Sequence, residues 1–202
     1  MEAILFDLDG TLWDSADGVL KTWNMVIAKH PECNRGLLTE EELAGYFGLP
    51  MKEIANRMFS HSTEEEKEVL MEECCKLENE YLAEHGGILF PKLAETLEIL
   101  HKEYKLFIVS NCQSGYIESF IKAHKMEAYF DDIQCWGDNM VPKGENNKLI
   151  MQRNRCFLCI FDKKADSGKA WCTIWIILWI NWQSVSTQEK SCVPMQQQKH
   201  VK

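Results

Sequence analysis

The stretch "ILFDLDGTLWDS", residues 4–15, decides the predicted fold, because its apolar run ends abruptly in Asp and Gly. A short apolar run closed by turn-forming residues is typical of a buried strand. Asp7 and Asp9 flank one residue at the end of this strand. Side chains two positions apart lie on one face of a strand, so both carboxylates would face the same way if the strand continued. Gly10 then allows a sharp turn, and Thr11 adds a hydroxyl.

The polar residues at this strand end predict phosphate and metal chemistry. Two close carboxylates repel each other unless a cation joins them, which indicates a Mg²⁺ site. A carboxylate is also a competent nucleophile for phosphoryl transfer. The stretch "YKLFIVSN", residues 104–111, repeats the pattern and ends in Ser110 and Asn111, donors suited to phosphate oxygens. In "VPKGENNKL", Lys143 stands just before a predicted helix, where its ammonium could neutralise phosphate and nucleophile together.

Further strand and helix patterns alternate along the chain. Residues 131–138 and 155–162 resemble the first two strand patterns, and residues 92–104 and 115–124 have helical spacing of apolar residues. Strands that alternate with helices predict an α/β fold with a mainly parallel sheet. In such sheets ligands bind at the carboxyl ends of the strands, which is where the polar residues described above fall.

Residues 16–86 differ from the rest of the chain because they contain no strand pattern. Thr39 with Glu42, and Thr63 with Glu66, have the spacing of capping boxes at helix starts. The second start predicts one long amphipathic helix that two consecutive glycines stop. We therefore expect an all-helical insertion between the first strand and the rest of the sheet.

Composition predicts a globular protein that acts on small molecules. The chain has 202 residues, 46% of them hydrophobic, and a formal net charge of −9. No basic patch favours nucleic acid, and the apolar window at 171–182 is shorter than the roughly twenty residues that span a bilayer. The start of the chain does not resemble a secretory signal, and nine scattered cysteines favour reduced thiols. We expect a cytoplasmic monomer with no nucleic-acid or membrane partner.

Three of these stretches carry a resemblance to the haloacid dehalogenase superfamily. "ILFDLDGTLWDS" resembles its first motif, in the branch similar to phosphoglycolate phosphatases, "LFIVSN" the second and "PKGEN" the third. Residues 16–86 are similar to the small helical cap of these enzymes, and "FGLPMKEI" at 47–54 resembles the cap loop that helps select substrate. The resemblance implies a three-layer Rossmann-like core built from 1–15 and 87–202, with 171–202 left unassigned within it.

The resemblance also implies a role for each site residue. Asp7 would be the nucleophile and a Mg²⁺ ligand. Asp9 would protonate the leaving oxygen and then activate water, with its backbone carbonyl on the metal. Ser110 and Asn111 would hold the phosphoryl group, and Lys143 would stabilise its charge. The expected reaction is Mg²⁺-dependent hydrolysis of a small phosphomonoester, of the phosphoglycolate or sugar phosphate type, through an aspartyl-phosphate. Dehalogenases of the superfamily need neither a metal nor the second aspartate.

The fourth motif of the family is a strand that ends in Gly-Asp, with a second acid three to four residues later. Asp162 and Asp166 have this spacing and follow an apolar run, so the resemblance assigns both to the metal site. Phe161 stands where the family has glycine, and its ring would crowd the metal.

Beyond Asp166 the chain departs from the family pattern. Four of the seven tryptophans lie within 171–182, and the last twenty residues are polar without an apolar period. A shifted reading frame or a decayed gene would produce such a change, and a replacement strand in "TIWIILWI" is an alternative. Three functional alternatives stay open: a phosphomutase of the same superfamily, an inactive or truncated phosphatase-like protein, and an α/β domain without phosphate chemistry.

Overall fold

A parallel sheet forms the centre of the protein, in a computed structural model that describes residues 3–156 and 175–176. Within that part of the chain the strand order is β5-β4-β1-β6. The central strand pairs, β1 with β4 and β4 with β5, are all parallel. The expected strands are therefore confirmed as β1 (Ala3–Phe6), β4 (Lys105–Ser110) and β5 (Asp132–Cys135).

The fourth strand of the sheet, β6 (Trp175–Ile176), lies within the stretch considered as a replacement strand. It pairs in parallel with β1, on the side opposite β4. The strand expected at 155–162 lies outside the described residues beyond Cys156.

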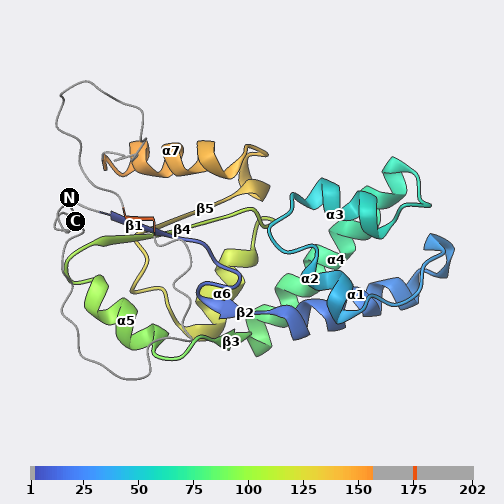
Figure 1. The fold of residues 1–202 in the computed structure, drawn as a ribbon, viewed down its shortest axis with the longest axis horizontal. Helices are drawn as coiled ribbons and strands as arrows, with labels where there is room; N and C mark the ends of the chain where they lie inside the picture. Colours follow the sequence, from blue (N-terminus) through green and yellow to red (C-terminus); the bar gives the residue numbers. More distant parts are fainter. Residues whose placement is uncertain (1–2, 157–174, 177–202) are drawn as a thin grey trace, which may run out of the picture.

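Helices cover both faces of the sheet, because successive side chains of a strand point to opposite sides. Ile4 and Phe6 of β1 join a hydrophobic cluster with α5 (Leu93–Leu100) and α6 (Tyr116–His124), which lie on one face. Ala3 and Leu5 pack instead with residues of α7 (Lys143–Arg153) on the other face (Figure 1). The predicted three-layer α/β fold with a mainly parallel sheet is thereby confirmed.

The helices of residues 16–85 lie beyond one end of the sheet (Figure 1). The chain enters and leaves this region through two short strands that pair antiparallel. None of the described helices is both long and apolar enough to cross a bilayer. The entry strand, the helices and the exit strand are β2 (Trp13–Asp14), α1 (Ala16–Lys29), the 3₁₀ turn Pro31–Cys33, α2 (Glu40–Ala44), α3 (Met51–Met58), α4 (Glu64–His85) and β3 (Ile88–Leu89).

One of the two predicted capping boxes is complete and the other is half formed. At the start of α4, Thr63 Oγ1 accepts from the Glu66 amide, and Glu66 Oε2 accepts from the Thr63 amide at 2.8 Å. At the start of α2, Thr39 caps the helix, but the Glu42 carboxylate binds elsewhere. It accepts a hydrogen bond of 2.9 Å from Arg35 Nη2, so the second half of that capping box was wrong.

The helix expected over 92–104 is shorter in the structure. It begins at Leu93 and ends at Leu100 as α5, and turns carry the chain into β4 at Lys105. The chain has to reverse direction before it can join the parallel sheet, so the last helical residues give way to that turn.

Candidate active site

A cavity of about 300 Å³ lies at the carboxyl ends of β1 and β4. Its lining brings together five of the seven predicted site residues, although three different segments of the chain supply them. These five are Asp7, Asp9, Ser110, Asn111 and Lys143. The other two predicted residues, Asp162 and Asp166, lie outside the described residues.

Asp7 follows directly after the last residue of β1 and is held by two contacts to one carboxylate oxygen. Asp7 Oδ1 accepts a hydrogen bond of 2.8 Å from the Leu8 amide and lies 2.7 Å from Lys143 Nζ. The Asp7 side chain is half exposed, at 50%. Because both contacts use Oδ1, Oδ2 is the oxygen with the freer lone pairs for a metal or a phosphorus atom.

Asp9 occupies a different environment, because β1 ends at Phe6 and the chain turns. The condition for both carboxylates to face one way, a strand that continues past Asp7, is therefore not met, and the Asp9 carboxylate is held by a set of buried donors. Asp9 Oδ1 accepts hydrogen bonds from Trp13 Nε1 at 3.0 Å, Ser15 Oγ at 3.0 Å and Tyr116 OH at 2.8 Å.

Burial raises the pKa of the Asp9 carboxyl above its ordinary value, and the negative charge of Asp7 adds a smaller effect in the same direction. The hydrogen bonds from Tyr116, Ser15 and Trp13 lower this pKa in part. The balance favours the protonated form of Asp9 more than in an exposed aspartate. A carboxyl in this state can give a proton to a leaving group.

Ser110 and Asn111 stand at the end of β4 and have different partners. Ser110 is buried, and its Oγ accepts a hydrogen bond of 3.3 Å from the Cys112 amide. Asn111 Nδ2 donates to the carbonyl of Gly48 at 3.3 Å. Gly48 belongs to the stretch 47–54 that resembles a substrate-selecting loop, so Asn111 connects the sheet to that loop.

Lys143 is the first residue of α7, and a buried asparagine one turn later fixes the start of that helix. Asn146 is fully buried, and its Nδ2 donates to the carbonyls of Cys135 and Val141 at 3.2 Å each. Its Oδ1 accepts a hydrogen bond of 2.7 Å from Asn139 Nδ2. These bonds tie the helix start to the end of β5, which sets the position from which Lys143 reaches Asp7.

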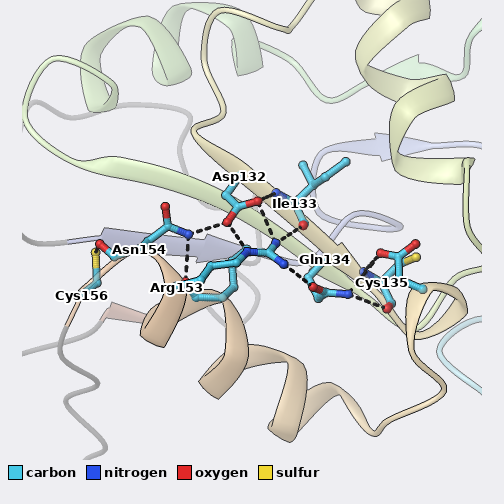
Figure 2. A network of polar contacts seen from close by, with 9 residues as sticks. Asp132, Ile133, Gln134, Cys135, Arg153, Asn154 and Cys156 are labelled. Carbon is cyan, nitrogen blue, oxygen red and sulfur yellow. Dashed lines mark hydrogen bonds and ion pairs between the residues drawn. The ribbon is translucent and has the colours of Figure 1, made fainter.

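The far end of α7 is held against the start of β5 by a second polar network (Figure 2). Arg153 binds both carboxylate oxygens of Asp132, through Nε at 2.6 Å and Nη2 at 2.7 Å. Its Nη1 donates to Gln134 Oε1 at 2.8 Å, and Asn154 Nδ2 also donates to Asp132. With both ends anchored on one strand, α7 has little freedom to move Lys143.

Sequence reasoning missed two groups that line the same cavity. Tyr116, at the start of α6, reaches Asp9, and nothing in its local sequence distinguishes it from a core aromatic residue. Glu78 lies in α4 among many other glutamates, so its sequence context predicts a solvated acid. It is nevertheless only 3% exposed.

The oxygen atoms that line the cavity supply some of the ligands that a hard divalent cation needs. Mg²⁺ prefers carboxylate, carbonyl and water oxygens, and Asp7 offers a carboxylate in the cavity. Within residues 3–156 there is no cluster of three or more His, Cys, Asp or Glu side chains that could hold a metal ion. The described residues therefore fit a cation that keeps much of its water or takes further ligands from elsewhere.

Comparison with protein families gives one match that covers most of the chain. The model of the haloacid dehalogenase-like hydrolases matches residues 4–155, which include all of β1 except Ala3, the helices α1–α4 and the whole of α7. The match thus extends over every described residue that lines the cavity.

Two curated proteins similar to the chain are phosphoglycolate phosphatases. The one from Vibrio parahaemolyticus is 25% identical over 158 residues, which are 75% of this chain and 67% of that protein. The one from Aliivibrio fischeri is 24% identical over 156 residues, 72% of this chain and 66% of its own length. The chain thus spans about two thirds of these relatives.

Two solved structures have the same fold as this chain. A putative haloacid dehalogenase-like hydrolase from Bacteroides fragilis superposes with a TM-score of 0.65 at 25% identity, covering 76% of this chain and 73% of that one. CbbY from Rhodobacter sphaeroides, in complex with xylulose-(1,5)bisphosphate, superposes with a TM-score of 0.63 at 19% identity, covering 77% and 73%. At 19% identity the second likeness shows the fold alone.

Proposed function

The chain belongs to the haloacid dehalogenase-like hydrolase family, and from this premise we propose that it is a Mg²⁺-dependent phosphatase. It would hydrolyse a small phosphomonoester through an aspartyl-phosphate intermediate. The family and the phosphatase class predicted from the sequence agree with the family match and with the relatives named above. The observation that carries the proposal is the contact of 2.7 Å between Asp7 and Lys143 in one cavity with the partly buried Asp9.

In the first step, an Asp7 carboxylate oxygen would attack phosphorus. Oδ2 suits this role, because Oδ1 already accepts from Leu8 and contacts Lys143. A bond forms between Asp7 and phosphorus, and the bond from phosphorus to the ester oxygen breaks. Protonated Asp9 would give its proton to that leaving oxygen, which departs as an alcohol.

In the second step, water would attack phosphorus and release phosphate. Asp9, now ionised, would accept the proton of the attacking water, and the bond between Asp7 and phosphorus would break. This returns Asp7 as a carboxylate and Asp9 as an acid, so the cycle balances. The three hydrogen bonds to Asp9 Oδ1 support this exchange, because they stabilise its ionised form between the two steps.

The remaining polar residues would bind the phosphoryl group. Lys143 would offset the charge that develops on its oxygens, and Ser110 and Asn111 would donate hydrogen bonds to them. Mg²⁺, held by Asp7 and the Asp9 carbonyl and by the predicted ligands Asp162 and Asp166, would further neutralise this charge.

The substrate classes that the relatives suggest are phosphoglycolate and sugar phosphates. The two curated relatives are named for the first, and the CbbY structure holds a sugar bisphosphate. We propose that residues 16–86 act as a cap over this substrate, supported by the cavity residues that they supply. A cytoplasmic location and a monomeric state stay predictions.

The test is phosphate release from 4-nitrophenyl phosphate by the full chain, with Mg²⁺ and then with EDTA. We expect turnover that EDTA abolishes and that Asp7→Asn reduces by at least about 1,000-fold. Asp17→Asn is the matched control, because Asp17 is an exposed aspartate in the first turn of α1. Turnover that survives Asp7→Asn would show that Asp7 is not the nucleophile. Turnover unaffected by EDTA would show that the reaction does not depend on a metal.

A further inference from the structure

A single buried carboxyl stands on the wall of the cavity that the helices α1–α4 supply. Glu78, on the inner side of α4, lines this cavity and is 3% exposed. Its Oε2 accepts a hydrogen bond of 2.7 Å from Trp23 Nε1 of α1. The indole thus fixes the orientation of the carboxyl, which the proposed mechanism does not use.

Cationic side chains are nearly absent from this wall. Among the described lining residues, Lys143 is the only Lys, Arg or His, and it already contacts Asp7. The part contributed by the helices and their loops offers instead aliphatic and aromatic side chains, among which Trp23 contacts Glu78 directly. The lining that residues 16–86 supply is therefore mainly apolar, with one acid.

Within the described part of the chain, no positive charge near Glu78 balances its ionised form. Burial raises the pKa of the Glu78 carboxyl to about 8, and the nearby charge of Asp9 contributes in the same direction. The hydrogen bonds from Trp23 and Gln113 lower this pKa and offset only part of the effect. An ammonium group in the cavity would supply the missing charge, because a buried carboxylate is stable when it is paired.

From this arrangement we infer that Glu78 binds an ammonium group on the leaving-group side of the substrate. The substrates are then phosphate monoesters of small amino alcohols: the phosphoryl end lies at Asp7 and Lys143, and the amine lies at Glu78. The inference rests on the proposed phosphatase activity and narrows its substrate. The Trp23 ring beside Glu78 adds cation–π attraction to the amine without a competing charge.

The same wall disfavours a substrate with a second negative group. A carboxylate on the leaving group would meet Glu78 and the aromatic rings, and no described cationic side chain on that wall would pair with it. Phosphoglycolate is therefore a poorer substrate than an amine of the same size.

Four esters of nearly equal size separate these possibilities: 2-aminoethyl phosphate, 2-hydroxyethyl phosphate, n-propyl phosphate and phosphoglycolate. With the full chain and Mg²⁺, we expect kcat/KM for the amine to exceed each of the others by at least about 10-fold, the size of one charge-assisted hydrogen bond. Glu78→Gln keeps the size of the side chain and an acceptor for Trp23. We expect it to lower kcat/KM for the amine at least about 10-fold. For the two esters with an uncharged leaving group, 2-hydroxyethyl and n-propyl phosphate, kcat/KM should change less than about 3-fold.

Binding gives a second readout that needs no turnover. Calorimetry with the full-length Asp7→Asn protein measures the affinity for each ester, and the same order is expected, with the amine tightest. Equal values for the amine and its hydroxyl analogue, or a preference for phosphoglycolate, would overturn the inference. The absence of phosphate release from all esters would instead overturn the proposed function. In that case the ranking of the four measured affinities decides whether Glu78 binds an ammonium group. Absence of binding by all four esters would also overturn the inference about Glu78.

Discussion

Lys143 Nζ lies 2.7 Å from Asp7 Oδ1, a contact that joins the start of α7 to the end of β1 across the cavity. Lys143→Met keeps the length of the side chain and removes its charge. We expect kcat to fall at least about 100-fold, because the charge of the transferred phosphoryl group loses its cation. Lys148→Met is the control, since Lys148 is an exposed lysine of the same helix that pairs with Glu145. A loss that is equal in both variants would contradict a specific role for Lys143.

Tyr116→Phe tests the donors around Asp9. It removes the hydrogen bond of 2.8 Å to Asp9 and the contact of 2.7 Å with Ser15, while Trp13 and Ser15 still reach Asp9. We expect kcat to fall by about 3- to 10-fold and the free energy of unfolding by about 1 kcal/mol, the usual worth of one hydrogen bond. Urea denaturation and steady-state rates measure the two effects. Tyr129→Phe, outside the cavity, should change neither, and an unchanged kcat in Tyr116→Phe would argue against the role of the hydroxyl.

The pH dependence of stability should reveal Glu78. The pKa of the Glu78 carboxyl is about 8 in the folded protein and has its ordinary value of 4.5 in the unfolded chain. Below pH 4.5 the carboxyl is therefore protonated in both the folded and the unfolded state. Between these values the unfolded chain releases the proton and the folded one keeps it, so stability falls as pH rises. The slope approaches about 1.4 kcal/mol per pH unit, and the loss stops above pH 8.

Glu78→Gln lacks this titration, so its stability relative to the unmodified protein should rise steadily from pH 5 to pH 8. Urea denaturation at half-unit pH intervals measures the difference, in which the titration of other groups cancels. Parallel pH profiles for the two proteins would show that Glu78 titrates as an exposed acid.

Gly137 tests the close packing that supports the site. A Cβ atom at Gly137 would lie 2.1 Å from the backbone nitrogen of Ser114 and 2.6 Å from the carbonyl carbon of Gln113. Because backbone atoms cannot move aside easily, we expect Gly137→Ala to destabilise the protein by about 2–3 kcal/mol. Gly36→Ala is the control, since no atom lies within 4 Å of its added Cβ. Thermal melts measure the melting temperatures of the Gly137→Ala and Gly36→Ala variants. Equal melting temperatures would contradict the close packing inferred around Gly137.

The strands and the polar residues at their ends could be predicted from sequence because each is a local pattern. The apolar run before Asp7 and the run before Ser110 became β1 and β4, side by side and parallel. Helix α4 followed from the capping box at Thr63, in which both partners lie within one turn.

Other features depend on contacts between distant segments, which no local pattern encodes. The turn after Phe6 sends Asp9 toward Tyr116, although a continued strand would have kept it beside Asp7. Burial of Glu78 depends on Trp23, which a different helix supplies. Glu42 likewise binds Arg35 and not the helix start, because Arg35 Nη2 offers a charged donor to both of its carboxylate oxygens.

The antiparallel pairing of β2 with β3 has a consequence for how such a protein can change over evolutionary time. It sets Asp14 opposite Ile88, so the helical region starts and finishes at adjacent points of the core. A segment with neighbouring ends can be exchanged for another without disturbing the order of the sheet. Glu78, the acid proposed to face the leaving group, lies in this segment, whereas Asp7 and Lys143 lie outside it. In the proposed enzyme, selectivity and reaction chemistry are therefore encoded in separate segments of the chain, and one can diversify while the other is retained.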